Sequence, residues 1–255
     1  MRLSRWVLVA TSLLLTPVRA FAQAEGTPVV PGLTLHIYEA VQPDTIVFQR
    51  SVTRAGQDST AGTRTVVMHA LFPASGAHLL EVEQRFPAGG GEIVDTAIDE
   101  LHTLRAVAHR SHQPTRTMSF HFSGNAAEGT VSLKRPAGDS VVSVLQDLGG
   151  PIFDSNVIDL VVAALPLRSG YTNELPFFIY ERGGRVVMPV AVRERATIPF
   201  PKLGPRDAWV VSVGVPGAPA TVWVDAKTHA VLRVRYDITA RSMSFTDERV
   251  TPLRG

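Results

Sequence analysis

A short, nearly continuous apolar segment near the middle of the chain constrains the fold more than any other feature. Asp154 or Ser155 can cap a helix at its start, and Pro166 ends it near Leu165. A helix that is apolar around most of its circumference must be covered by other elements. The apolar residues of this segment are Val157, Ile158, Leu160, Val161, Val162, Ala164 and Leu165. Since strands are predicted on both sides of it, we expect a curved sheet to wrap around this helix.

The rest of the chain has the pattern of an antiparallel sheet. Turn-forming clusters recur roughly every 8–15 residues, and the segments between them are short and often alternate in polarity. Met118, Phe120 and Phe122, for example, alternate with polar residues, which places one face of their strand on a core. Strands are predicted at 33–37, 64–72, 78–86, 104–111, 116–123, 129–134, 140–146, 176–182, 185–193, 208–215, 220–225 and 230–238. The predicted fold class is all-β with one buried helix: an antiparallel incomplete β-barrel (half-barrel) curled around a helical plug.

The N-terminus has the three parts of a secretory signal. Arg2 and Arg5 give a positive start, residues 6–15 form an apolar run, and small-x-small sites predict cleavage after Ala22 or Ala24. The apolar run is about half of the roughly 20 residues that a spanning helix needs. We therefore expect no stable membrane span after cleavage, and a protein that is periplasmic or secreted.

These patterns divide the chain into three parts. Residues 1–22 are the expected signal peptide, residues 23–32 a flexible lead-in, and residues 33–250 a single β domain. No internal repeat and no second composition regime indicate a further domain.

Charge and residue content exclude several function classes. Signal cleavage would remove three of the 25 basic residues and none of the 23 acidic ones, so the mature chain would be close to neutral. No basic cluster with interleaved aromatic residues is present, and we expect no nucleic-acid partner.

The chain has no cysteine and no Gly-x-Ser-x-Gly or His-Glu-x-x-His motif. We therefore expect no enzyme and no cofactor. Asp95, Asp99 and Glu100 are interpreted as a solvated turn.

Histidines offer one enzymatic alternative. A three-residue turn in the hairpin at 113–115 would set His109 opposite Ser119, with His121 diagonally across on the same face. His69 or Glu81 could supply the third ligand that zinc requires. Two histidines on the wetter face of a sheet are more often plain surface, so a metal-dependent hydrolase that uses the His109/His121 face is the lesser alternative.

Three segments resemble a bacterial family of exported envelope proteins of unknown function. Residues 152–154 with 164–171 are similar to its element of a helix, then Leu-Pro-Leu, then glycine. Residues 221–225 followed by Thr228 and 231–234 are similar to its tryptophan–aspartate hairpin, and 119–124 with 129–131 to its meander. The resemblance implies a fold similar to the lipoprotein carriers of the LolA and LolB type, which bind acyl chains in an apolar cavity between half-barrel and plug. This chain lacks the anchoring cysteine of the LolB pattern.

The binding hypothesis rests on apolar and aromatic side chains near the helix. In a half-barrel, some of them would line the space between sheet and helix as a ligand pocket, although the same side chains could fill a dry core. The expected ligand-binding residues are Val157, Val161, Leu165, Phe177, Tyr180, Trp209 and Trp223. The expected function is non-enzymatic binding of a lipid or other apolar ligand. A structural or protein-interaction module of the envelope, which uses exposed sheet edges, is the alternative.

Overall fold

The computed structural model describes residues 31, 35 and 42–253, apart from 89 and 137. The expected signal peptide, nearly all of the lead-in and most of the strand expected at 33–37 lie outside the described residues. Within these, fifteen strands form one sheet. The strands are β1 (Thr45–Arg54), β2 (Gln57–Leu71), β3 (Leu79–Ala88), β4 (Gly91–Glu100), β5 (Ala106–Gln113), β6 (Arg116–Ser123), β7 (Ala126–Leu133), β8 (Ser140–Asp147), β9 (Phe153–Asp154), β10 (Thr172–Ile179), β11 (Gly184–Phe200), β12 (Gly204–Val215), β13 (Ala218–Asp225), β14 (Val231–Ile238) and β15 (Met243–Arg249). The helical segments are η2 (Ser155–Val157), α1 (Ile158–Ala163), η3 (Tyr180–Arg182) and η4 (Thr239–Arg241).

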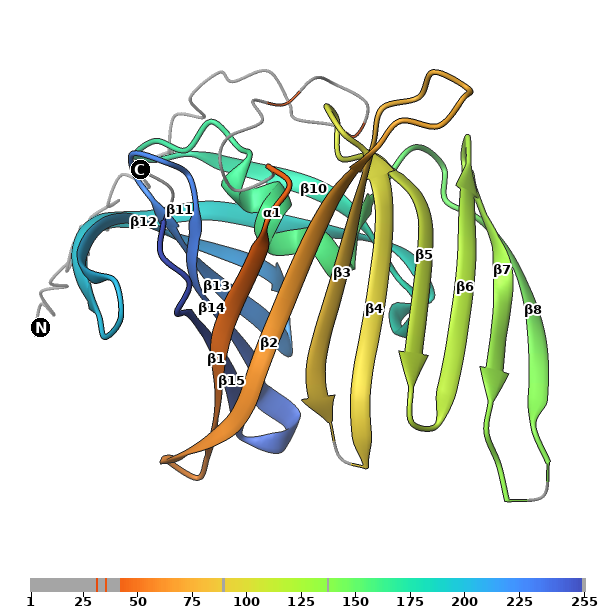
Figure 1. Cartoon of the computed structure of the whole chain (residues 1–255), viewed down its shortest axis with the longest axis horizontal. Coiled ribbons are helices and arrows are strands. Elements are labelled where there is room, and N and C mark those ends of the chain that lie inside the picture. Colours follow the sequence, from red (N-terminus) through yellow and green to blue (C-terminus); the bar gives the residue numbers. More distant parts are fainter. Residues whose placement is uncertain (1–30, 32–34, 36–41, 89, 137, 254–255) are drawn as a thin grey trace, which may run out of the picture.

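The strand order shows two antiparallel meanders joined along one ladder. Strands β1 to β8 follow one another across one half of the sheet, and β10 to β15 across the other. The halves meet where β1 pairs with β15, with Phe48 opposite Arg249 and Arg54 opposite Met243. Among the described strands, only β9 pairs in parallel, with β10. In Figure 1 the two halves curve toward each other and α1 lies between them.

The helix is buried inside the curl of the sheet. All six residues of α1 are buried, and the main core cluster joins them to inward-facing residues of both halves, such as Phe48 and Val222. The side chain of Asp154 caps the helical segment by accepting a hydrogen bond from the Asn156 backbone N–H at 2.8 Å. The sheet stays open, because β8 and β9 are its two edges. The predicted half-barrel around a helical plug is therefore confirmed.

An aromatic contact holds the C-terminal half against the N-terminal half. The ring of Phe178 in β10 lies 5.1 Å from that of Phe120 and 4.9 Å from that of Phe122, both in β6, between centroids. Nearby, the backbone N–H of Ala106 donates to the carbonyl of Ile152 at 3.0 Å. A second, smaller core cluster forms here. The curl is thus fixed both by the β1–β15 ladder and by this contact.

Each strand that the alternation predicted after residue 42 is present, with ends shifted by a few residues. Four further strands, β1, β4, β9 and β15, were not predicted. Within the part of the chain that the structure describes, no helix has the length and apolar character of a membrane span.

Candidate functional site

The inward-facing residues of β1 change in character along the strand. Ile46 and Phe48 are buried in the main core, Arg50 follows, and Val52 and Arg54 line a pocket. Because alternate residues of a strand face the same side, these five form a series that leads away from the helix. The concave side of the sheet is therefore divided into a core, a polar level and a pocket.

The polar level crosses several strands and one helix, and we call it the polar belt. It contains one arginine from each of β1 and β2, a glutamine from β3, and carboxylates from α1 and β15. All of these side chains are buried. The members are Arg50, Arg64, Gln84, Asp159 and Asp247.

Arg50 and Asp247 form the outer pair of the belt. The Arg50 guanidinium donates from Nε to Oδ1 and from Nη2 to Oδ2 of Asp247, both at 2.7 Å. This two-point geometry is among the strongest ion-pair arrangements in proteins. The same guanidinium carbon lies 4.3 Å from the ring centroid of Phe86, a pocket residue. Arg50 therefore connects the belt to the wall of the pocket.

Arg64 connects the sheet to the helix. Its Nη2 contacts Asp159 Oδ2 at 2.7 Å and its Nε donates to Gln84 Oε1 at 2.8 Å, while the Gln84 amide donates to the carbonyl of Asn156. Its Nη1 lies 3.6 Å from Asp247 Oδ2. Burial opposes the charge of Arg64, but the facing carboxylates outweigh it and raise its pKa above the ordinary value. The belt is thus charged but internally balanced.

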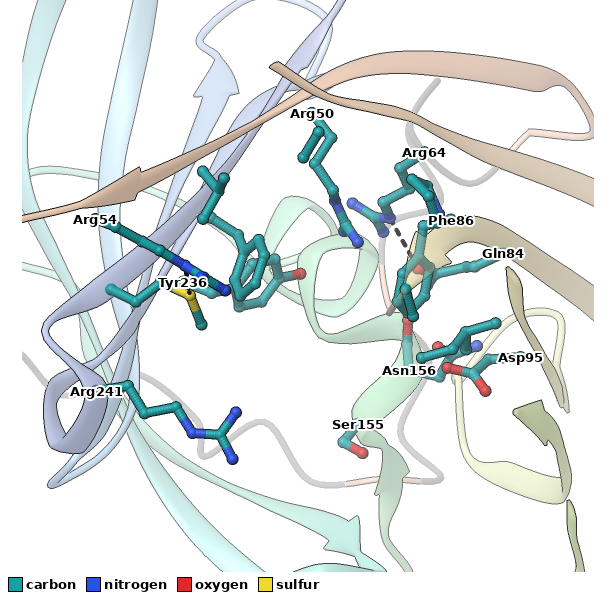
Figure 2. Close-up of a pocket in the computed structure, with 17 residues that line it drawn as sticks. Arg50, Arg54, Arg64, Gln84, Phe86, Asp95, Ser155, Asn156, Tyr236 and Arg241 are labelled. Carbon is teal, nitrogen blue, oxygen red and sulfur yellow. Dashed lines mark hydrogen bonds between the residues drawn. The ribbon is translucent and has the colours of Figure 1, made fainter. Parts of the chain in front are cut away.

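Beyond the belt lies a pocket of about 660 Å³ on the concave side. Its walls come from both halves of the sheet and from η2 (Figure 2). The apolar part of the lining consists of Val52, Ala61, Phe86, Pro87, Ala88, Ile93, Met243 and Phe245. The pocket is therefore a mainly apolar hollow with a polar floor.

Two exposed arginines also line this pocket. Arg54 ends β1 and Arg241 lies in η4, two positions before Met243, the register partner of Arg54. The Nε of Arg54 contacts the sulfur of Met243 at 3.2 Å. In Figure 2 both side chains extend toward the pocket from the same side. Within the described part of the chain, neither has a carboxylate within ion-pair distance.

A second pocket of about 220 Å³ lies beside the first and is lined by His109 and Tyr180. His109 Nδ1 is 2.8 Å from Oδ2 of the buried Asp154. Burial alone would lower the pKa of His109, but the charge and hydrogen bond of Asp154 raise it above the ordinary value. The geometry orients the imidazole and favours its protonated form.

The expected histidine face is not formed. The β5–β6 turn contains two residues rather than three, so His109 pairs with Phe120 and not with Ser119. His109 therefore faces the buried side, whereas His121 is exposed on the other face. Among the described residues, no group of three or more side chains is placed to hold a metal ion.

The interpretation of Asp95, Asp99 and Glu100 as a solvated turn is wrong. All three belong to β4, and Asp99 is fully buried. Burial raises the pKa of Asp99 well above its ordinary value, and the charge of Asp154 adds to this effect. Burial likewise raises the pKa of Asp95, which lines both pockets.

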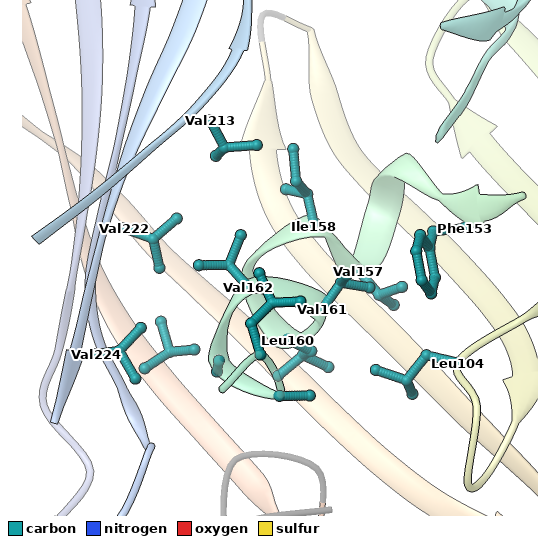
Figure 3. Packing of buried hydrophobic residues seen from close by; sticks show 14 of the residues in the cluster. Leu104, Phe153, Val157, Ile158, Leu160, Val161, Val162, Val213, Val222 and Val224 are labelled. Carbon is teal, nitrogen blue, oxygen red and sulfur yellow. The ribbon is translucent and has the colours of Figure 1, made fainter. Parts of the chain in front are cut away.

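The structure separates the seven residues that were expected to bind a ligand. Four of them, Val157, Val161, Leu165 and Phe177, are fully buried in the main core, and Figure 3 shows Val157 and Val161 packed within it. Apart from Tyr180, none of the seven lines either pocket.

The two tryptophans lie on opposite faces of the C-terminal half. Trp209 packs at the margin of the main core. Trp223 belongs to a separate cluster with Phe200, because its neighbours Val222 and Val224 face the helix.

The ligand-binding role of the seven residues stays a prediction, while the pockets are lined by a largely different set of residues. The sequence carries no signal for this set, because pattern reasoning assigns the charged residues of β1, β4 and β15 to water.

Comparison with known proteins gives a family and distant structural similarity. No curated protein matches the sequence. Among solved structures, the chain is similar to a β-barrel-like protein of the domain of unknown function DUF1849 from Brucella abortus, at 10% identity over 83% of this chain and 97% of that chain, with a TM-score of 0.43. It is also similar to a DUF1329 family protein from Desulfovibrio piger, at 10% identity over 83% and 85%, with a TM-score of 0.28. A domain described as that of an outer membrane lipoprotein-sorting protein, from Vibrio parahaemolyticus, is 13% identical over 81% and 83%, with a TM-score of 0.21.

The family assignment rests on the sequence. Residues 76–246 match the family described as protein of unknown function DUF3108. This match begins just before β3, ends within β15 and covers most of the described half-barrel. The resemblance to a family of unknown function is thereby confirmed, and the chain belongs to the DUF3108 family.

Proposed function

We propose that this protein binds an apolar, lipid-like ligand in the pocket beyond the polar belt, without catalysing a reaction on it. The observation that carries the proposal is the hollow of about 660 Å³ on the concave side of the half-barrel. Its volume is within the range of about 300–1,000 Å³ typical of small-molecule sites. A sheet that only enclosed a core would have no need for such a space beyond its plug.

The lining supports an apolar ligand over a polar one. Phe86 and Phe245 come from opposite halves of the sheet, and Val52 and Ile93 also line the pocket. Apolar surface removed from water in such a site contributes about 25 cal/mol per Å². In the belt beneath, the guanidinium groups already face the carboxylates of Asp247 and Asp159, and among the described belt residues only Arg64 Nη1 is a buried atom without a hydrogen-bond partner. Apolar contact would therefore supply most of the affinity.

The place of action that fits this proposal is the cell envelope. The expected signal peptide at 1–22 would direct the chain to the periplasm or beyond. An apolar ligand in an aqueous compartment needs a carrier or a binding protein, because its transfer into water is costly.

Fluorescence of a neutral apolar dye, N-phenyl-1-naphthylamine, tests the proposal. The mature protein should enhance the dye signal, and dodecanol should displace the dye. Val52→Asn places an amide in the pocket and should weaken the binding of both the dye and dodecanol by about tenfold or more. Val187→Asn, the same change at an exposed position of β11, is the matched control. A wild-type protein that binds neither dye nor dodecanol, and from which no apolar species can be extracted, would contradict the proposal.

An exposed sheet edge favours a second candidate function, the binding of an extended partner segment. β8 is an edge strand, and its residues Val141 and Leu145 are 66% and 77% exposed. Unpaired edges can accept an additional strand. A photo-crosslinker at position 145 should attach to the partner segment. A synthetic peptide of that segment should then protect the backbone amides of β8 from hydrogen exchange. Absence of such protection would reject this second function.

A further inference from the structure

We infer that the ligand of this pocket carries an anionic headgroup, a phosphate or a carboxylate, which Arg54 and Arg241 hold at the rim. This inference rests on the proposed function, since it adds a headgroup to the apolar ligand. It assigns a ligand class, anionic amphiphiles, and an orientation within the pocket.

The charges around the pocket are matched at the floor and unmatched at the rim. Arg50 is paired with Asp247, and Arg64 with Asp159. Within the described residues, by contrast, no carboxylate lies within 4.0 Å of Arg54 or Arg241, although both line the same pocket. The one carboxylate in the lining is Asp95, and burial raises its pKa, which disfavours its negative charge. The rim therefore has a positive excess that a bound anion would neutralise.

The two rim arginines come from adjacent segments of the fold. The β1–β15 register places Arg54 opposite Met243, and Arg241 precedes that residue by two positions. A guanidinium presents a planar set of donors that matches the oxygens of a carboxylate or phosphate. Two such groups from adjacent segments can bind one phosphate from two sides, and Figure 2 shows both reaching toward the hollow.

The distribution of polarity fixes the orientation of the ligand. An anion at the floor would meet guanidinium groups that Asp247 and Asp159 already neutralise. At the rim it would meet unpaired ones, with water still in contact. The chain of the ligand would then extend inward between Phe86 and Phe245. The headgroup thus lies outermost and the apolar chain is covered.

Competition against the apolar dye with dodecyl phosphate, dodecanol and inorganic phosphate tests this inference, with both amphiphiles below their aggregation concentrations. The two amphiphiles have the same chain and differ in the headgroup. Wild-type protein should bind dodecyl phosphate about tenfold or more tightly than dodecanol, because hydrogen bonds to charged groups are strong. This preference should decrease in 0.5 M salt, since exposed charges are screened.

The variant Arg54→Gln/Arg241→Gln should lose the preference and keep its affinity for dodecanol. The control Arg185→Gln/Arg193→Gln changes net charge equally at exposed positions of β11 and should keep the preference. Equal binding of both amphiphiles by wild-type protein, or a preference that survives in the rim variant, would overturn the headgroup assignment while the proposed function stands. Binding of neither amphiphile would overturn the proposed function itself. Inorganic phosphate that binds as tightly as dodecyl phosphate would identify a free-anion site and reject the amphiphile.

Discussion

The guanidinium of Arg64 in β2 and the carboxylate of Asp159 in α1 form an ion pair of 2.7 Å, with both side chains 2% exposed. Asp159 is the one charged residue of a helix whose other residues are aliphatic. The pair therefore sets which side of the helix faces the polar belt. Burying two charged side chains away from water costs free energy, and this cost is offset only while both partners of the ion pair are present.

Loss of one partner of this pair should strongly destabilise the protein. Asp159→Asn leaves the buried Arg64 without its main counter-charge, and we expect the free energy of unfolding to fall by about 3 to 5 kcal/mol. Urea denaturation followed by tryptophan fluorescence measures the change. Asp207→Asn breaks the exposed pair with Arg195 and should have little effect, because water already screens that pair. Equal effects of the two substitutions would contradict this account.

The stability of the fold should depend on His109 near neutral pH. Burial disfavours its charge, but Asp154 raises its pKa above the ordinary value. A raised folded-state pKa means that the stabilisation is present below about pH 6.5 and is lost as the pH rises through the folded-state pKa. His109→Gln should flatten this part of the profile of unfolding free energy against pH. The exposed His69→Gln should leave it unchanged, and parallel profiles for wild type and His109→Gln would reject the assignment.

Asp99 should make the protein less stable as the pH rises. Both of its carboxylate oxygens are buried without a hydrogen-bond partner among the described residues, and its pKa is raised. The folded state keeps a proton that the unfolded state releases above about pH 3.9, at a cost of about 1.4 kcal/mol per pH unit up to the folded-state pKa. Asp99→Asn should therefore raise the unfolding free energy at pH 7 and change it little at pH 4. A gain of the same size at both pH values would contradict the prediction.

Gly129 in β7 should not tolerate a side chain. A Cβ atom there would lie 2.0 Å from the carbonyl oxygen of Ser119 and 2.7 Å from the Phe120 ring. Gly129→Ala must shift β6 or β7, and we expect a loss of about 1 to 3 kcal/mol in unfolding free energy. Thr130→Ala, at the exposed next position, is the control. Equal midpoints of thermal unfolding for the two variants would show that the strands adjust freely.

Alternation and composition predicted the parts of the fold where burial and polarity agree. The apolar segment around Val161 could only be a covered helix, and strands such as β6 alternate cleanly. The predicted pairing of β5 with β6 was wrong by one residue, because the turn consists of Pro114 and Thr115 alone. A shift of one residue moves a side chain to the other face of the sheet, which is why His109 was expected in water.

Three of the four strands that were missed, β1, β4 and β15, share one property. Each directs a charged residue to the concave side: Arg50 in β1, Asp99 in β4 and Asp247 in β15. Pattern reasoning assigns such residues to water, since isolated buried charges are unfavourable. Only the three-dimensional pairing of Arg50 with Asp247 makes those two positions acceptable, whereas Asp99 is tolerated because burial raises its pKa and favours the neutral carboxyl group. For the same reason the belt and the pocket above it could not be found from the sequence alone.

The ladder between β1 and β15 makes the pocket depend on contact between the two ends of the domain. Val47 and Thr251, which are hydrogen-bonded beside this ladder, are 204 positions apart in the chain. Contacts of such long range form slowly, because the intervening chain must first be brought together. Until β15 is in place, β1 has a partner strand on one side only, and Val52 and Phe245 cannot yet line a common pocket. The capacity to hold a ligand therefore requires both ends of the domain, because the two walls of the pocket come together only when β15 pairs with β1.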